Sequence, residues 1–339
     1  MGANSKIEWT HYTFNPWIGC AKVHTGCANC YAEADMDTRR GRVQWGHEGT
    51  RSKTSATYWQ QPERWNAEAH RTKMNHAWAS SLAVGEYDTP GPYDRPRVFC
   101  ASLADVFEEY AGHVLDHAGV RLYRDAAGQI TREPAAGLNA NQPVFLDHLR
   151  SDLFDLIDRT RQLDWLLLTK RPENVRQMWK SAKAYADGGH CQPRRNVWLG
   201  ASASDQHTFD RMVPSLLAAG LDVLPAVLFL SLEPLTGPVD MTAFLWEQNV
   251  AMPRRWVIVG GESGPSARPC RLEWVSSIVD QCAEADIPVF MKQLGANPTT
   301  KTADGIQHLT LKNRKGGEPY EWPRNVRVRY FPDVEKIDS

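Results

Sequence analysis

Short apolar runs recur along the chain, and each is followed by polar residues and then by a stretch with helical periodicity. Helix-period segments cover residues 147–160, 205–219 and 272–285. Seven apolar runs have the length of buried strands, at residues 14–18, 98–101, 165–168, 197–199, 227–232, 256–259 and 289–291. Apolar strands that alternate with helices are typical of a parallel sheet built from βα units. The pattern therefore predicts an α/β fold, a complete or partial (β/α) barrel.

Two stretches fall outside this alternation. One is a polar insertion at about residues 110–142, in which residues 120–132 alternate around a glycine and predict a small hairpin. The other is the tail after Gly295, whose residues 326–331 predict a late edge strand. We therefore expect a barrel domain over residues 1–295 and a C-terminal extension over residues 296–339 that packs on it.

Composition narrows the class of protein. The chain has 339 residues, 42% of them hydrophobic, which is enough for one large barrel domain or two smaller ones. Its formal net charge of −1 gives no overall basic field for nucleic acid. The seven cysteines have no paired spacing, and no apolar run approaches the roughly 18 residues of a membrane span. These features predict a cytoplasmic protein that does not enter a membrane.

Polar residues follow the apolar runs at the points where strands are expected to end. Because parallel strands of a barrel all end on one face, these residues are expected to converge on a single pocket. In chain order they are Ser102, Asp105, Lys170, Arg171, Ser202, Glu233, Gly260, Gly261, Glu262 and Lys292. Each alone is equally compatible with a solvated loop. Together they suit a zwitterionic, hydroxyl-bearing ligand, with the lysine and arginine for a carboxylate and the glutamates for an ammonium or a ribose.

Three cysteines lie close together near the N-terminus, after the first apolar run. Cys20, Cys27 and Cys30 form a C-x6-C-x2-C cluster without an evident fourth thiolate. Soft thiolates select iron–sulfur, zinc or Cu(I), and a structural zinc site requires four closed ligands. Three cysteines suit an iron–sulfur cluster with one open iron. Two alternatives stay open: a zinc site completed by His24, and three unrelated free thiols.

These motifs, taken in order, resemble a known family. The run from Trp9 through Asn15-Pro16-Trp17 and the cysteines to Tyr31-Ala32-Glu33, with the later strand ends, resembles the phage-associated three-Cys-motif family related to radical S-adenosylmethionine (SAM) enzymes. The wider radical SAM superfamily usually has C-x3-C-x2-C with an aromatic before the last cysteine. Here the first gap is longer, Tyr31 follows the last cysteine, and the Gly-Gly-Glu element comes only after the sixth run, as Gly260-Gly261-Glu262.

The resemblance implies a fold, a cofactor set and a chemistry. The fold is a barrel of the radical SAM type. The cysteines hold three irons of a 4Fe-4S cluster, and SAM binds the fourth. Reductive cleavage of SAM, with an external electron donor, yields a 5'-deoxyadenosyl radical that abstracts hydrogen from a substrate. The cofactor pocket is expected from Tyr31, Ser102, Asp105, Lys170, Ser202, Gly260, Gly261 and Glu262, and the catalytic side from Arg171, Glu233 and Lys292.

The substrate is the least determined part of this hypothesis. Basic residues from Arg39 to Lys53 are interleaved with aromatics from Trp45 to Trp65, which suggests a nucleic-acid surface or an ordinary solvated helix end. The leading hypothesis is a radical SAM enzyme that acts on nucleic acid or a modified base. A peptide or small-molecule substrate, and a non-catalytic DNA-binding module stabilised by zinc or a cluster, are the alternatives.

Overall fold

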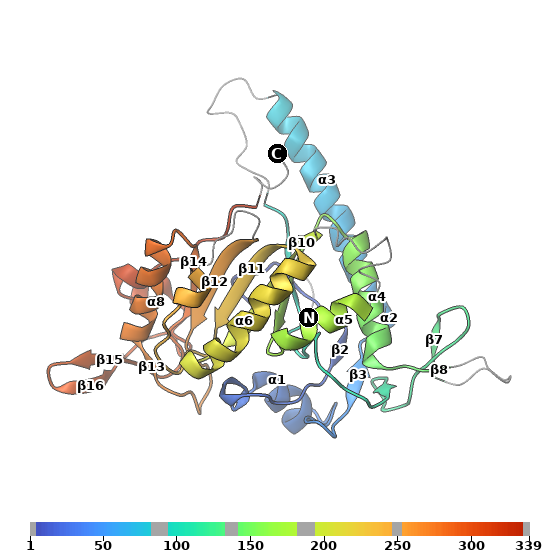
Figure 1. The fold of residues 1–339 in the computed structure, drawn as a ribbon, viewed down its shortest axis with the longest axis horizontal. Helices are drawn as coiled ribbons and strands as arrows, with labels where there is room; N and C mark the ends of the chain where they lie inside the picture. Colours follow the sequence, from blue (N-terminus) through green and yellow to red (C-terminus); the bar gives the residue numbers. More distant parts are fainter. Residues whose placement is uncertain (1–4, 83–93, 133–141, 182–193, 246–252, 335–339) are drawn as a thin grey trace.

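A curled parallel sheet forms the body of the protein (Figure 1). The computed structural model describes residues 5–82, 94–132, 142–181, 194–245 and 253–334. The sheet has seven strands in the order β1-β4-β9-β10-β11-β12-β14, and every neighbouring pair is parallel. Their bounds are Tyr12–Thr13, Arg97–Cys100, Asp164–Thr169, Arg194–Ala203, Pro225–Leu232, Arg254–Gly260 and Val289–Gln293. The sheet closes only part of a circle, so the predicted α/β partial barrel is confirmed as a half-barrel.

Helices cover the outer face of the sheet (Figure 1). Outward-pointing strand residues such as Leu199, Leu230 and Val257 are fully buried in one cluster with the apolar faces of these helices. The helices are α4 (Leu146–Arg159), α5 (Pro172–Ser181), α6 (Gln206–Val223), the short α7 (Thr242–Leu245) and α8 (Leu272–Glu284). The three helices expected from periodicity correspond to α4, α6 and α8, which confirms those predictions. Burial of an apolar stripe against the sheet explains the periodicity.

The inner face of the half-barrel carries a second apolar layer. Successive side chains on a strand point to opposite faces, so alternate residues of the same strands face inward. These inner residues form an aromatic-rich cluster of Leu166, Trp198, Phe229, Trp256 and Phe290, joined by Trp9 and Phe331. Ring centroids lie 5.6 Å apart for Trp198 and Trp256, and 5.3 Å apart for Trp256 and Phe331. The two chain ends thus fill the concave side that a half-barrel leaves open.

The first strand was predicted at residues 14–18, and this placement is wrong. Only β1, Tyr12–Thr13, pairs with β4 in the main sheet. Residues Trp17–Ile18 form β2 in a separate sheet with β3 (Arg51–Lys53) and β5 (Val114–Leu115). The break falls at Asn15-Pro16, because proline has no N–H to give to a ladder. The cysteine loop therefore begins from β2 rather than from the half-barrel.

The sequence analysis also missed the longest helix. The chain after β3 forms α2, Ala56–Trp59, and then α3, Gln61–Leu82, which extends away from the body in Figure 1. Between residues 63 and 78 of α3, only Trp65 and Ala69 are buried. A helix that stands largely in solvent needs no apolar stripe, so it gives little periodic signal.

The insertion and the tail form small sheets beside the half-barrel. The predicted hairpin within residues 120–132 is confirmed by the antiparallel pair β6 (Tyr123–Arg124) and β7 (Ile130–Thr131). The predicted edge strand at 326–331 is reduced to one bridge between Arg329 and Phe290 on β14. The remaining elements are β8 (Gln142–Pro143), β13 (Cys270–Arg271), β15 (Pro298–Thr302), β16 (Gly305–His308), α1 (Tyr31–Glu33), a π-helical turn (Ala34–Arg39) and 3-10 turns at Thr25–Cys27, Pro319–Glu321 and Arg324–Val326. No helix in the described ranges is long and apolar enough to span a membrane.

Candidate functional site

A pocket of about 690 Å³ brings together the cysteine loop and residues at the carboxyl ends of the strands. Of the residues predicted for the site, only Gly260 does not line it. The predicted residues on its wall are Cys20, Cys27, Cys30, Tyr31, Ser102, Asp105, Lys170, Arg171, Ser202, Glu233, Gly261, Glu262 and Lys292. They come from segments up to 272 residues apart between Cys20 and Lys292, so the half-barrel is what assembles them.

The pocket forms because the inward-facing residues of the strands change from aromatic to small or polar toward the carboxyl ends. On β11 the inward residues pass from Phe229 in the aromatic layer to Ser231 and then Glu233 on the pocket wall. On β10 the inward position between Trp198 and Ser202 is Gly200, where a Cβ would lie 2.5 Å from the Phe229 ring. The aromatic layer is therefore the floor of the pocket, and polar side chains follow it toward the carboxyl ends of β10 and β11.

The cysteine loop contributes three thiols from different local structures. Cys20 follows β2, Cys27 ends a 3-10 turn, and Cys30 directly precedes α1. Gly19 allows the chain to enter the loop, since its φ is +114° and a Cβ would lie 2.4 Å from the Thr50 carbonyl oxygen. The loop therefore depends on glycine before the first cysteine.

His24 has a local role within the loop. Its Nδ1 accepts a hydrogen bond from the Gly26 amide at 3.0 Å and caps the 3-10 turn. Burial lowers the pKa of His24 to about 4, and the positive charges of Lys170 and Arg211 add to the shift. The imidazole is therefore neutral at physiological pH.

The arrangement of the thiols bears on which metal group they fit. In the described part of the chain, no three His, Cys, Asp or Glu side chains lie close enough to hold one metal ion. A zinc ion gathers four ligands around a single centre, whereas a four-iron cluster receives each cysteine on a separate iron. Three soft thiols that line one pocket match in number the protein ligands of a cluster with one open iron.

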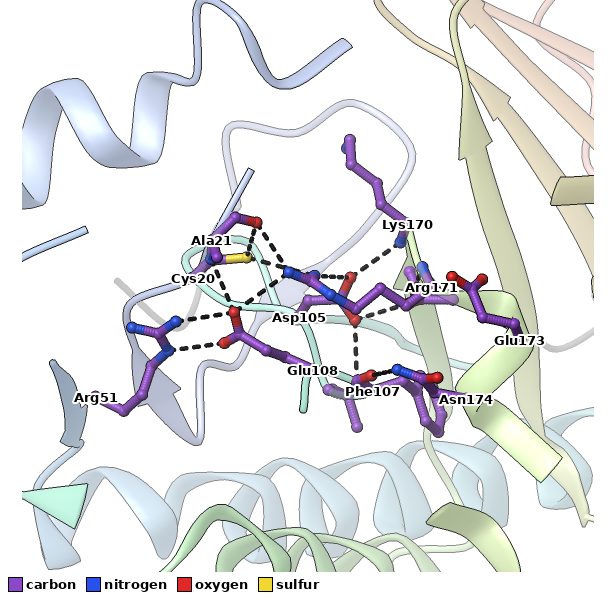
Figure 2. A network of polar contacts seen from close by, with 12 residues as sticks. Cys20, Ala21, Arg51, Asp105, Phe107, Glu108, Lys170, Arg171, Glu173 and Asn174 are labelled. Carbon is purple, nitrogen blue, oxygen red and sulfur yellow. Dashed lines mark hydrogen bonds and ion pairs between the residues drawn. The ribbon is translucent and has the colours of Figure 1, made fainter. Parts of the chain in front are cut away.

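Arg171 lies at the centre of a buried polar network (Figure 2). Its guanidinium donates to Asp105 at 2.9 Å, to Glu108 at 3.3 Å and to the Cys20 sulfur at 3.7 Å. Arg171 as a whole is only 6% exposed. Arg171 and Asp105, both predicted to bind ligand groups, therefore satisfy each other's charge. The side chain of Lys170 extends away from this network.

Glu108 and Arg51 extend the network on the side away from Arg171. Both side chains are 1% exposed, and Arg51 donates to Glu108 from Nε at 2.7 Å and from Nη2 at 2.8 Å. The sequence analysis placed Arg51 on a basic surface, which is wrong, because its charge is neutralised in the interior. It missed Glu108 altogether. The available signal was a carboxylate directly after the apolar pair Val106-Phe107.

Glu262 holds the far end of the cysteine loop. It accepts from Arg268 Nε at 2.9 Å and Nη2 at 2.8 Å, and from Asn29 Nδ2 at 3.1 Å. Arg268 also donates to the Thr25 carbonyl oxygen at 2.9 Å. Burial raises the pKa of Glu262, but the hydrogen bonds from Arg268 and Asn29 outweigh it and hold this pKa below its usual value. Asn29 and Arg268 were not predicted, because 239 residues separate them in sequence.

Glu233 and Lys292 form an ion pair across the strand that lies between them. Gly260 on that strand leaves the space, since a Cβ there would lie 3.5 Å from Lys292 Cβ and 3.6 Å from Glu233 Cγ. Gly261 has a stricter role, because its Cβ would lie 2.1 Å from the Leu294 carbonyl oxygen. Both glycines therefore serve the packing of the chain itself.

Positive charge exceeds negative charge on the pocket wall. Each carboxylate that lines it is ion-paired within the protein: Asp35, Asp105, Glu233 and Glu262. Lys6 and Lys170 line it without an ion pair to any described residue. Tyr31 remains 60% exposed and donates its hydroxyl proton to the Ser102 carbonyl oxygen at 2.6 Å. The unpaired lysines favour a ligand with an anionic group.

The aromatic residues of the stretch 39–65 do not form the predicted nucleic-acid surface. Tyr58 stacks on Phe14 with centroids 5.2 Å apart, and Trp65 stacks on Tyr12 at 4.3 Å. Arg39 and Arg40 are paired with Asp35. Packing of α2 and α3 against Tyr12 and Phe14 buries much of these two rings, so Tyr58 and Trp65 do not supply stacking positions for a base. Only Trp45 and Arg40 of its named residues line the pocket.

A comparison of the sequence with protein families gives one match. A family described as "Protein of unknown function (DUF5131)" matches residues 4–122 and 140–322. The chain belongs to the DUF5131 family. The matched ranges contain the cysteine loop and all the strand ends of the pocket, and they omit residues 123–139 of the insertion. No curated protein and no solved structure matches this DUF5131 chain.

Proposed function

We propose that this DUF5131 protein is an iron–sulfur enzyme of the radical SAM type, with its active site in the 690 Å³ pocket. One observation carries the proposal: three thiols, with no fourth from the described residues, line the same pocket as the polar strand ends of a half-barrel. Cys20, Cys27 and Cys30 would hold a 4Fe-4S cluster. Such a cluster supplies the electron that cleaves SAM reductively and so provides a radical for hydrogen abstraction.

The residues of the chain supply binding, orientation and exclusion of water. The aromatic floor, with Trp9 and Phe99 on the pocket wall, keeps the base of the site apolar. The Glu233–Lys292 pair offers opposite charges that suit the ammonium and carboxylate of a zwitterion. Lys170, with its unpaired amine, suits a second carboxylate or a phosphate. A dry pocket with fixed charges strengthens each of these interactions.

The substrate that this pocket supports best carries an anionic group, in keeping with nucleic acid or a modified base. Two observations favour it: the unpaired Lys6 and Lys170, and the exposed ring of Tyr31, on which a base can stack. The pocket volume lies in the usual range for small ligands, about 300–1,000 Å³, so it suits one nucleotide rather than a duplex. A peptide or small molecule with an acidic group is the second candidate. A non-catalytic DNA-binding module stabilised by zinc or a cluster is the remaining alternative.

Anaerobic reconstitution with iron and sulfide tests the proposal. We expect about four irons and four sulfides per chain, and loss of the cluster in Cys20→Ser, Cys27→Ser and Cys30→Ser. Cys282→Ala, which removes a buried core thiol far from the pocket wall, is the matched control and should retain the cluster. The reconstituted protein is then reduced with dithionite and SAM, with and without single-stranded DNA or RNA, and 5'-deoxyadenosine is measured. Stoichiometric zinc, or a full cluster in all three serine variants, would refute the assignment.

A further inference from the structure

The peptide that follows Cys20 is held from both sides by charged groups. Glu108 Oε1 accepts a hydrogen bond from the Ala21 amide at 2.8 Å. Arg171 Nη2 donates to the Ala21 carbonyl oxygen at 2.9 Å. Figure 2 shows these contacts together with the Arg51–Glu108 pair behind them. Because hydrogen bonds to charged groups are the stronger kind, this peptide is fixed without any bound cofactor.

Arg171 reaches the cysteine itself through its other nitrogen. Nη1 lies 3.7 Å from the Cys20 sulfur while it also donates to Asp105. Asp105 is held in turn by the Thr169 hydroxyl at 2.7 Å and the Phe107 amide at 3.0 Å. A planar guanidinium can make these bonds at once, and a lysine ammonium cannot. The direction of Arg171 toward the sulfur is therefore set by the surrounding protein.

The other two cysteines are held differently. In the described residues no arginine donates a hydrogen bond to the sulfur of Cys27 or Cys30. Their part of the loop is fastened through the backbone, by Arg268 at Thr25 and by the Glu262–Asn29 contact. The cysteine loop thus has two separate attachments, and in the described residues only the one at Cys20 includes a hydrogen bond from an arginine to a sulfur.

We propose that Arg171 is a positioning residue for Cys20. It fixes this cysteine before a cluster is assembled, and it keeps a charged donor on the Cys20 sulfur once a cluster is bound. The second part rests on the function proposed above. A hydrogen bond and a positive charge at a ligand sulfur favour the reduced, more negative cluster, so Arg171 raises the reduction potential.

Amide hydrogen exchange of the cluster-free protein tests the first part. In Arg171→Gln, and also in Arg171→Lys, we expect the Ala21 amide to exchange about tenfold to a hundredfold faster than in the wild type. The Ala28 amide, which donates to the Thr25 carbonyl oxygen that Arg268 also contacts, should be unaffected. Arg268→Gln should give the reverse result. Arg176→Gln, which breaks the pair between Arg176 on α5 and Asp222 on α6, is the control and should change neither amide. Unchanged protection of Ala21 in Arg171→Lys overturns the proposal, and this variant retains the buried charge should Arg171→Gln fail to fold.

Potentiometric titration of the reconstituted protein tests the second part. We expect a lower midpoint potential in Arg171→Gln than in the wild type, a smaller decrease in Arg171→Lys, and no change in Arg176→Gln. Equal potentials in all four proteins would show that Arg171 does not act on the cluster. If the wild type assembles no cluster, the proposed function fails, and the exchange of Ala21 still decides whether Arg171 positions Cys20.

Discussion

Glu108→Gln should strongly destabilise the protein, although glutamine has nearly the same shape as glutamate. The carboxylate is 1% exposed and accepts four hydrogen bonds, two from Arg51, one from Arg171 and one from the Ala21 amide. A glutamine at this position keeps one acceptor oxygen and turns an NH2 group toward the guanidinium donors. The substitution therefore leaves the buried charge of Arg51 without its counter-ion.

The expected cost follows from that burial. Removal of one partner from a buried ion pair costs about 3–5 kcal/mol of the free energy of unfolding, because the remaining charge stays in the interior. Glu63→Gln is the matched control. Glu63 pairs with Arg159 at 3.2 Å, but both side chains are more than half exposed, so its loss should cost about 0–1 kcal/mol. The two variants differ in burial and not in chemistry.

Equilibrium unfolding in urea, followed by circular dichroism and tryptophan fluorescence, measures both costs. We expect a large decrease in the midpoint for Glu108→Gln and almost none for Glu63→Gln, with similar slopes. Replacing Arg51 by methionine in the Glu108→Gln background should recover part of the loss, because it removes the uncompensated charge. A cost below about 1 kcal/mol for Glu108→Gln would refute the description of this network as buried and tightly paired.

Three further predictions concern the pocket. Gly261→Ala should cost about 1–3 kcal/mol in thermal unfolding, because its Cβ meets the Leu294 carbonyl, whereas Gly260→Ala should be tolerated; equal costs would contradict this contrast. The pKa of His24 is lowered by burial from 6.5 to about 4, so the unfolded chain takes up a proton first and the free energy of unfolding should fall as pH decreases through this interval. His24→Asn keeps a capping acceptor and should reduce that slope, to which the lowered pKa values of His11 and His148 also contribute, in urea titrations at several pH values. Lys170→Gln should weaken calorimetric binding of a nucleoside monophosphate about tenfold and leave adenosine unaffected; an equal effect on both would exclude a phosphate contact.

The sequence by itself determined the sheet, the main helices on it and the face on which the site lies. Apolar runs such as β11 are buried on both faces and α6 has an apolar stripe, so their patterns follow from local burial. Parallel strands place all their carboxyl ends together, which is why residues as distant as Cys20 and Lys292 could be assigned to one pocket before any coordinates. The predicted N-terminal strand was misplaced, because Asn15-Pro16 separates β1, which precedes the predicted run, from β2 at the end of that run.

Only the tertiary structure decided which charges are available to a ligand. Arg51 and Lys170 are both basic residues in polar surroundings of the sequence, yet one is neutralised by Glu108 and the other remains unpaired in the pocket. An ion pair depends on a distance of a few ångströms between side chains that sequence separation does not encode, as with Glu233 and Lys292. The aromatic rings of Tyr58 and Trp65 behave likewise, since stacking in a core and stacking on a base use the same residue type. The sequence thus determined which charged and aromatic side chains are present. Tertiary packing determined which of them face the pocket.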